Sequence, residues 1–190
     1  IFRNKPQMNL CSIQESNDLV VSRGDLRSPE KDQAIIEYFC RDDLGSSVKE
    51  DLEYLLEVFH DAKEYGSILE VKEIDFEALE NRIEEIRNNA PDDLYELQYR
   101  EVILEKIPPL IQQAKIMSQK YDVVSTNPPY MGHRGMNPGL SRFIRNKYPD
   151  TRVDLFAVFM ELDKHLVKTN GYMAMINQHQ WMFVSSFKKF

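Results

Sequence analysis

The sequence predicts an α/β fold in which a mainly helical, acidic region precedes a region that carries strands. Residues 121–126 form a short β-branched run, residues 171–177 form a second, mainly apolar run typical of a strand, and helical spacing separates the two. The charge is divided in the same way. Residues 1–120 hold 15 Lys and Arg against 26 Asp and Glu, whereas residues 121–190 hold 9 against 5. The net charge of −7 is therefore the sum of −11 and +4, which indicates two regions with different roles.

Helix start signals recur along the acidic region. Ser28 precedes Pro29, a residue type suited to the first position of a helix. Ser47 and Glu50 have the spacing of a capping box, and Asp75 precedes an apolar helical face. We expect helices over about residues 28–41, 47–65, 75–86 and 94–106, and from Pro108 to the strand at 121. The acidic side chains are expected on a solvated face, and a DNA-mimic or partner-binding surface is the alternative.

The run 121–126 is expected to be a buried strand, and it leads directly into Asn127-Pro128-Pro129-Tyr130. Each proline fixes φ near −65°, lacks a backbone donor and restricts the residue before it. The loop is therefore predicted to be stiff and extended, at the carboxyl end of a strand, where open α/β sheets bind ligands. An amide, a free proline carbonyl and an aromatic ring suit a planar substrate that carries an amino group.

The elements after this loop follow a regular order. Residues 154–168 have the apolar spacing of an amphipathic helix, which Asn170-Gly171 is expected to end as a C-cap. Residues 171–177 are expected to form a second buried strand. The segment Gln178-His179-Gln180-Trp181 then leads into another helix.

This arrangement resembles the S-adenosylmethionine-dependent, adenine-specific DNA methyltransferases, whose motif IV is Asn-Pro-Pro-Tyr. The order of strand, Asn-Pro-Pro-Tyr loop, Asp-Leu-Phe helix, Gly-Tyr strand and Trp is similar to that of their motifs IV to VI. The wider text of Asn-Pro-Pro-Tyr-Met-Gly, Asp-Leu-Phe-Ala-Val-Phe and Gln-His-Gln-Trp-Met-Phe looks like the PglX family of BREX phage-defence systems. The resemblance covers about residues 121–184. It implies a Rossmann-like methyltransferase domain.

The resemblance assigns roles to the loop. Asn127 and Pro128 would accept hydrogen bonds from the target amine, Pro129 would complete the motif, and Tyr130 would stack on an adenine flipped out of double-stranded DNA. The methyl donor would be S-adenosylmethionine, and other defence-system proteins are possible partners. Three alternatives stay open: a Pro-rich turn without chemistry, a methyltransferase for RNA guanine or a protein glutamine, and a non-catalytic interaction module for DNA or protein.

Residues 1–27 are expected to supply another strand of the catalytic domain. Residues 9–15 could form a strand that ends at Glu15, which the resemblance would place near the cofactor's adenine. Residues 28–120 would then be an acidic helical insertion between strands, because about 105 residues separate Glu15 from the strand at 121. Residues 121–190 would be the methyltransferase core.

The loop after Tyr130 is rich in glycine and carries cations. Arg134, Arg142 and Arg145 could contact DNA phosphates as positioning residues. The alternative is a mobile loop followed by a helix capped at Asn137, with these arginines in solvent. Trp181 is expected to pack below the loop rather than to stack on a base.

Other features set limits. The sequence has no apolar run that could span a bilayer, no secretory signal pattern and no metal constellation, so we expect a cytoplasmic protein whose Cys11 and Cys40 are reduced. None of the seven glycines forms a Gly-x-Gly pair, so the turn that approaches the cofactor in Rossmann-like folds is absent. The chain begins with Ile and is expected to be a fragment that alone binds S-adenosylmethionine weakly and is inactive.

Overall fold

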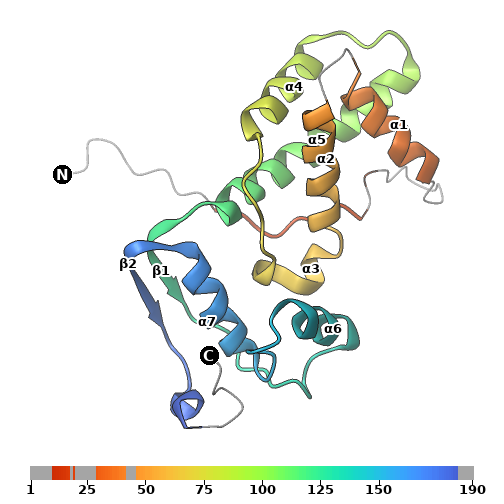
Figure 1. Cartoon of the computed structure of the whole chain (residues 1–190). Helices are drawn as coiled ribbons and strands as arrows, with labels where there is room; N and C mark the ends of the chain where they lie inside the picture. Colours follow the sequence, from red (N-terminus) through yellow and green to blue (C-terminus); the bar gives the residue numbers. More distant parts are fainter. Residues whose placement is uncertain (1–9, 18, 20–28, 42–45, 184–190) are drawn as a thin grey trace. The chain divides into compact units, whose positions relative to one another are not determined.

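The computed structural model describes residues 10–17, 19, 29–41 and 46–183, and the chain divides into two compact units (Figure 1). Unit 1 comprises Ile1–Lys63 and Val71–Ile116, and unit 2 comprises Glu64–Glu70 and Met117–Phe190. The regular elements described in unit 1 are all helices, whereas unit 2 holds helices and two parallel strands. The predicted combination of a helical region and an α/β region is therefore observed, and completion of the two strands into a Rossmann-like sheet stays a prediction.

Unit 1 is built around packed helices, as its apolar spacing predicted. The helices are α1 (Pro29–Phe39), α2 (Ser46–Val58), α4 (Phe76–Asn88) and α5 (Leu94–Ser118), and the short α3 (Ala62–Tyr65) continues into unit 2. Asp75 caps α4 as predicted, because its carboxylate accepts a hydrogen bond from the Ala78 amide at 3.0 Å. The predicted apolar face of α4 is buried through Leu79, Ile83 and Ile86. Ser28, the predicted N-cap of α1, lies outside the described residues.

A buried arginine, which the sequence analysis did not single out, connects α4 to the end of α1. The Arg82 side chain is only 4% exposed and donates hydrogen bonds to the carbonyls of Phe39 at 2.7 Å and Tyr38 at 3.3 Å. Its guanidinium also forms an ion pair with Glu85 at 3.0 Å. The last carbonyls of a helix lack intrahelical partners, so a buried cation at this point stabilises the helix end.

Two helix boundaries differ from the prediction. Helix α2 ends at Val58 rather than near Tyr65, because Asp61 takes a left-handed φ of 55° and a new turn begins at Ala62. Helix α5 continues through Pro108 and Pro109 instead of restarting there. The prolines remove two helix donors, but Ile103, Ile107, Leu110, Ile111 and Ala114 are all buried across them. Packing of this continuous apolar face outweighs the lost hydrogen bonds.

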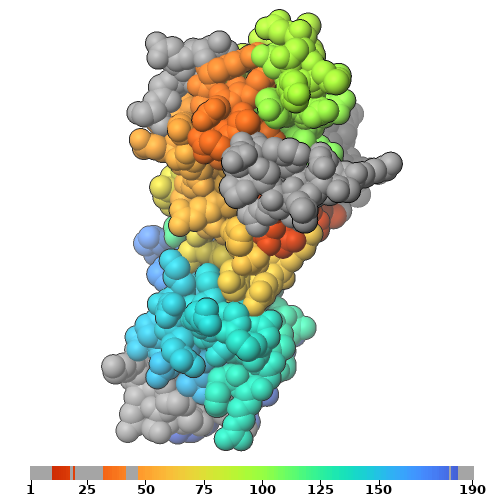
Figure 2. Space-filling view, turned by 90° about the vertical axis from the view of Figure 1, so that its right-hand side faces the viewer, coloured from red at the N-terminus to blue at the C-terminus, as the bar shows by residue number. Residues whose placement is uncertain are grey.

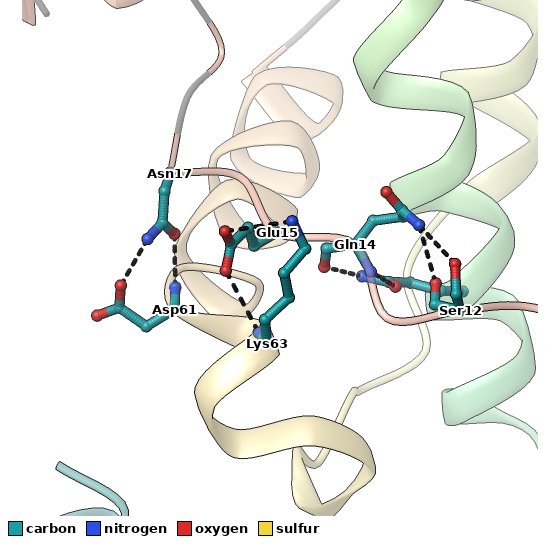
Figure 3. A network of polar contacts seen from close by, with 7 residues as sticks. Ser12, Gln14, Glu15, Asn17, Asp61 and Lys63 are labelled. Atoms are coloured by element: carbon teal, nitrogen blue, oxygen red, sulfur yellow. Dashed lines mark hydrogen bonds and ion pairs between the residues drawn. The ribbon is translucent and has the colours of Figure 1, made fainter.

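The strand predicted over residues 9–15 is not formed in the described residues 10–15, and Asn9 lies outside them. This segment is extended coil held by unit 1 (Figure 3). Gln14 exchanges two hydrogen bonds with the Gln113 side chain, at 2.8 and 2.9 Å, and the Ser16 amide donates to the Phe59 carbonyl at 3.1 Å. The backbone groups of Gln14 and Ser16 are therefore satisfied by other residues of unit 1 rather than by a neighbouring strand.

In unit 2, a helix crosses between two parallel strands. Strand β1 (Tyr121–Thr126) pairs with β2 (Val167–Met175), and α7 (Leu155–Leu166) connects them and packs against both (Figure 1). The register aligns Val123 with Tyr172 and Thr126 with Met175. Helix α6 (Pro138–Lys147) lies between β1 and α7 in sequence, and the 3-10 turn η2 (His179–Met182) follows β2. The carboxyl ends of both strands therefore lie at the same edge.

The core of unit 2 joins α6, α7 and the 3-10 turn η1 (Gly66–Ile68). Buried Ile68 packs in one cluster with Met136, Leu140, Ile144, Tyr148, Leu155 and Val158. The buried Tyr148 hydroxyl also donates a hydrogen bond to the Ile68 carbonyl at 2.7 Å. Burial raises the pKa of Tyr148, so this phenol remains a donor at physiological pH. The segment Glu64–Glu70, which belongs to the predicted helical region, is thus part of the packing of unit 2.

The strands of unit 2 differ from the prediction in two respects. Helix α7 ends at Leu166, and Asn170, with φ 68°, lies inside β2 at a register irregularity rather than at a C-cap. Neither strand is fully buried, since Val123 is 60% and Tyr172 75% exposed. Among the described residues, α7 covers the sheet and each strand has one strand neighbour, so the remaining apolar surface stays open.

Each of the described helices is too short or too polar to cross a bilayer.

The close packing around Gly171, at the irregularity in β2, can be tested by substitution. A Cβ at this position would lie 2.7 Å from Val167 Cγ2 and 2.9 Å from the Asp122 carbonyl oxygen. We expect Gly171→Ala to lower the free energy of unfolding by about 1–3 kcal/mol, as overpacking does. Urea unfolding measures this difference. Gly132→Ala is the matched control, because its Cβ would approach nothing closer than 3.6 Å, and equal stability of the two variants would contradict the prediction.

Candidate active site

The Asn127–Tyr130 loop begins where β1 ends and is exposed except at one proline. Asn127 and Pro129 are exposed, Pro128 is buried, and Tyr130 keeps 46% of its surface accessible. Pro128 thus anchors the loop against the protein while its neighbours face solvent. An exposed amide and an accessible aromatic ring next to each other are the groups that the predicted chemistry requires.

Tyr130 is held by two different elements of unit 2. Its hydroxyl donates a hydrogen bond to the Ile176 carbonyl at 2.8 Å, directly after the end of β2. Its ring meets the Phe156 ring of α7 edge to face, with 6.2 Å between centroids and an angle of 61° between planes. The hydroxyl and the ring of Tyr130 are therefore both held in place, while about half of the side chain stays accessible.

Asp154 fixes the chain that follows Tyr130. One carboxylate oxygen of Asp154 accepts hydrogen bonds from the Met131 amide at 3.1 Å and from the Phe156 amide at 3.3 Å. The Leu155 amide donates to the Met131 carbonyl at 3.0 Å, and Gly132 forms a β-bridge with Asp154. The same carboxylate therefore caps α7 and attaches the loop to it.

One face of α7 lies below the loop and the two strand ends. Phe156, Met160 and Asp163 follow the i, i+4, i+7 spacing of a single face. Phe156 contacts Tyr130, the Met160 sulfur accepts a hydrogen bond from the Asn177 side-chain Nδ2 at 3.4 Å, and Asp163 accepts one from the Thr126 side chain. Trp181 packs against the Phe156 and Met160 cluster, which agrees with its predicted packing role.

Asp163 is the residue of this face that the sequence analysis missed. It is 2% exposed, and its Oδ2 atom has no hydrogen-bond partner among the described residues. Burial raises the pKa of this carboxyl, and the hydrogen bond from Thr126 opposes the rise. The signal that could have found it is an acidic residue on the same helical face as Phe156 and Met160.

The three predicted DNA-contacting arginines lie in unit 2 and are exposed. Arg134 follows the loop, and Arg142 and Arg145 lie on α6. Asn137 caps α6 as predicted, accepting a hydrogen bond from the Leu140 amide at 2.8 Å. The segment 131–147 forms part of the surface of unit 2 that Figure 2 shows in blue-green. Both readings of these arginines, phosphate contacts or solvated side chains, agree with this exposure.

Glu15, the predicted cofactor contact, lies in unit 1, whereas the Asn127–Tyr130 loop lies in unit 2. Its carboxylate forms an ion pair with Lys63 at 3.4 Å and accepts a hydrogen bond from the Lys63 amide at the same distance (Figure 3). Beside it, Asn17 exchanges two hydrogen bonds of 2.6 Å with Asp61. These contacts attach the segment 10–17 to the helices of unit 1 and give Glu15 a structural role there.

Metal and thiol chemistry find no support in the described part of the chain. It contains no group of three His, Cys, Asp or Glu residues that could hold a metal ion. Cys11 and Cys40 are free, and burial raises the pKa of both thiols, which disfavours the reactive thiolate.

Comparison with known proteins gives a family match and two relatives. The sequence model described as "Eco57I restriction-modification methylase" matches residues 29–190. The chain is 42% identical over 133 residues to the adenine-specific methyltransferase BrxX of Escherichia coli O9:H4 (strain HS), which covers 70% of this chain and 11% of that protein. It is 54% identical over 79 residues to the adenine-specific methyltransferase PglX of Lacticaseibacillus casei (strain Zhang), which covers 42% and 7% respectively. The chain therefore spans about a tenth of the length of these relatives.

The buried carboxyl of Asp163 predicts how stability depends on pH. The pKa of Asp163 is higher in the folded state than in the unfolded state. As the pH rises, Asp163 therefore loses its proton first in the unfolded state, and the free energy of unfolding of the wild type decreases. Asp163→Asn removes this effect. The free energy of unfolding of the variant, relative to wild type, should therefore increase as the pH rises from about 4, the ordinary carboxyl pKa, to 7.

Urea unfolding at several pH values measures the difference. Asp150→Asn, which changes an exposed carboxyl, is the matched control. A difference between Asp163→Asn and wild type that is constant with pH, or that decreases as the pH rises, would contradict the assignment.

Proposed function

Because the chain belongs to the Eco57I restriction-modification methylase family, we propose that it supplies the acceptor side of the active site of a DNA methyltransferase. The enzyme would transfer a methyl group to the exocyclic amine of adenine in DNA, in the cytoplasm, as part of a restriction-modification or phage-defence system. The observation that carries this proposal is the Asn127–Tyr130 loop, held with its amide and ring accessible at the carboxyl end of β1. Both relatives are named adenine-specific methyltransferases, which favours adenine over RNA guanine or a protein glutamine.

Each loop residue has a role in this proposal. The Asn127 side-chain oxygen and the Pro128 carbonyl accept the two N–H groups of the adenine amine, which turns the nitrogen lone pair toward the incoming methyl group. Pro129 has no N–H that could compete for these acceptors, and it keeps the loop extended. Tyr130 stacks on the flipped base with the half of its surface that remains accessible.

The methyl donor in this proposal is S-adenosylmethionine, which supplies an electrophilic methyl group when bound. The residues of this chain suit binding of the adenine that accepts the methyl group rather than binding of the methyl donor. No pair of its seven glycines has Gly-x-Gly spacing, and Glu15 is engaged by Lys63 in unit 1. The contribution of this chain is therefore to orient the amine and to stack the base.

Arg134, Arg142 and Arg145 complete the proposal as contacts to DNA phosphates. They are exposed and belong to the +4 part of the sequence, which favours binding to a polyanion. Residues 28–120 keep their proposed role as an acidic helical insertion, and residues 121–190 keep theirs as the core of a Rossmann-like domain. The Asp and Glu of the helical region would repel DNA phosphates.

Substitutions in the loop test the proposal in the full-length enzyme. Asn127→Ala removes one acceptor of the amine and should lower kcat by roughly 10²–10³, as loss of an orienting transition-state hydrogen bond does. Tyr130→Ala should lower the methylation rate about 10- to 100-fold through lost stacking, whereas Tyr130→Phe keeps the ring and should be mild. Mass spectrometry of digested DNA measures the N6-methyladenine formed.

His133→Ala is the control for this series, because His133 is an exposed neighbour of the loop without an assigned role. It should methylate DNA like the wild type. Wild-type activity of Asn127→Ala, or a methylated base other than adenine in the wild-type product, would refute the proposal.

A further inference from the structure

Asp163 is an unexpected residue for its position in α7. Its helix buries Leu155, Phe156, Ala157, Val158, Met160 and Leu162, and Asp163 is as inaccessible as these, at 2%. One of its oxygens has no partner among the described residues. Burying a carboxylate that is only partly hydrogen-bonded costs stability, and an apolar side chain of similar size would avoid that cost. The stability of the fold alone therefore does not account for an aspartate here.

The partner of Asp163 lies directly before the loop. Asp163 accepts a hydrogen bond from the Thr126 side chain, and Thr126 is the last residue of β1. The Thr126 carbonyl in turn accepts a hydrogen bond from the Ile176 amide at 3.2 Å. Thr126 is therefore held by β2 through its backbone and by α7 through its side chain. The residue after it is Asn127, which is exposed.

We propose that Asp163 is a positioning residue, which fixes Thr126 through its hydroxyl and thereby sets the direction in which Asn127 leaves β1. This inference rests on the proposed role of Asn127 as an acceptor of the target amine. Two hydrogen bonds to Asp154 and Ile176 fix the far end of the loop at Met131 and Tyr130, and the Asp163–Thr126 contact fixes its near end. Misplacement of a reacting group by about 1 Å can cost about 10²-fold in rate.

Substitutions of the pair in the full-length enzyme separate positioning from stability. Thr126→Val keeps the shape of the side chain and removes the donor, so the carboxylate loses this hydrogen bond and the protein should become less stable. Asp163→Leu removes the carboxylate and should melt at or above the wild-type temperature. Both variants should lower kcat roughly 10- to 100-fold and leave the KM for S-adenosylmethionine within about twofold.

The double variant gives the sharpest readout. Adding Asp163→Leu to Thr126→Val should regain the lost stability without regaining kcat, and its loss of kcat should not exceed that of the single variants, because all three break the same contact. Thr126→Ser keeps the hydroxyl donor, and Asp163→Asn keeps an oxygen acceptor. Both variants should therefore have most of the wild-type kcat. His165→Gln, an exposed position on the same helix, is the control and should match the wild type.

The outcomes separate this inference from the proposed function. Absence of N6-methyladenine formation by the wild type would refute the proposed function itself. An active wild type combined with wild-type kcat for Thr126→Val and Asp163→Leu would overturn the positioning role. Recovery of kcat together with stability in the double variant would also overturn it, because a purely structural role predicts that result. If Asp163→Leu fails to fold, the comparison of Thr126→Val with Thr126→Ser still decides.

Discussion

The Asp154 carboxylate is the group on which the candidate site of this protein depends. It accepts hydrogen bonds from Met131, directly after the loop, and from Phe156, in the first turn of α7. A helix needs a partner for its first amides, and a loop with two prolines has few backbone donors of its own. The same oxygen serves both needs, so it attaches the end of the loop to the first turn of α7. The Phe156 ring and the Tyr130 ring then meet as a consequence of this attachment.

The rest of unit 2 extends this arrangement. Parallel strands place their carboxyl ends at one edge, and α7 crosses below that edge with Phe156, Met160 and Asp163 on a single face. Each of the three contacts a different segment: the loop, the end of β2 and the end of β1. The loop is therefore positioned from the helix below it, which leaves Asn127 and half of Tyr130 accessible to a substrate.

The parts of the fold that were predictable depend on local chemistry. The caps at Asp75 and Asn137 follow from side chains that bond to nearby amides, and the apolar face of Leu79, Ile83 and Ile86 follows from helical spacing. The Asn-Pro-Pro-Tyr loop was recognisable because four adjacent residues carry its chemistry, and the family match covers it. That match starts at residue 29, so the helical region also falls within the matched span.

The parts that were not predictable depend on partners distant in sequence. Helix α5 continues through Pro108 and Pro109 because of the residues that it packs against. The segment 10–16 is coil because Gln113 and Phe59, distant in sequence, bond to the backbone of Gln14 and Ser16. The left-handed residue Asn170 lies within β2, next to Gly171, where a Cβ would lie 2.9 Å from the Asp122 carbonyl oxygen of β1. The contact between Asp163 and Thr126 could not be predicted, because it depends on how α7 packs against β1.

Amide hydrogen exchange in Asp154→Ala tests the central claim, that this carboxylate holds the loop and α7 together. The account predicts that the amides of Met131 and Phe156 are both protected in the wild type and that both lose protection in the variant, while the amides of β1 keep theirs. Loss of protection at Phe156 alone, with Met131 unchanged, would contradict the account, because the loop would then be held by contacts independent of Asp154.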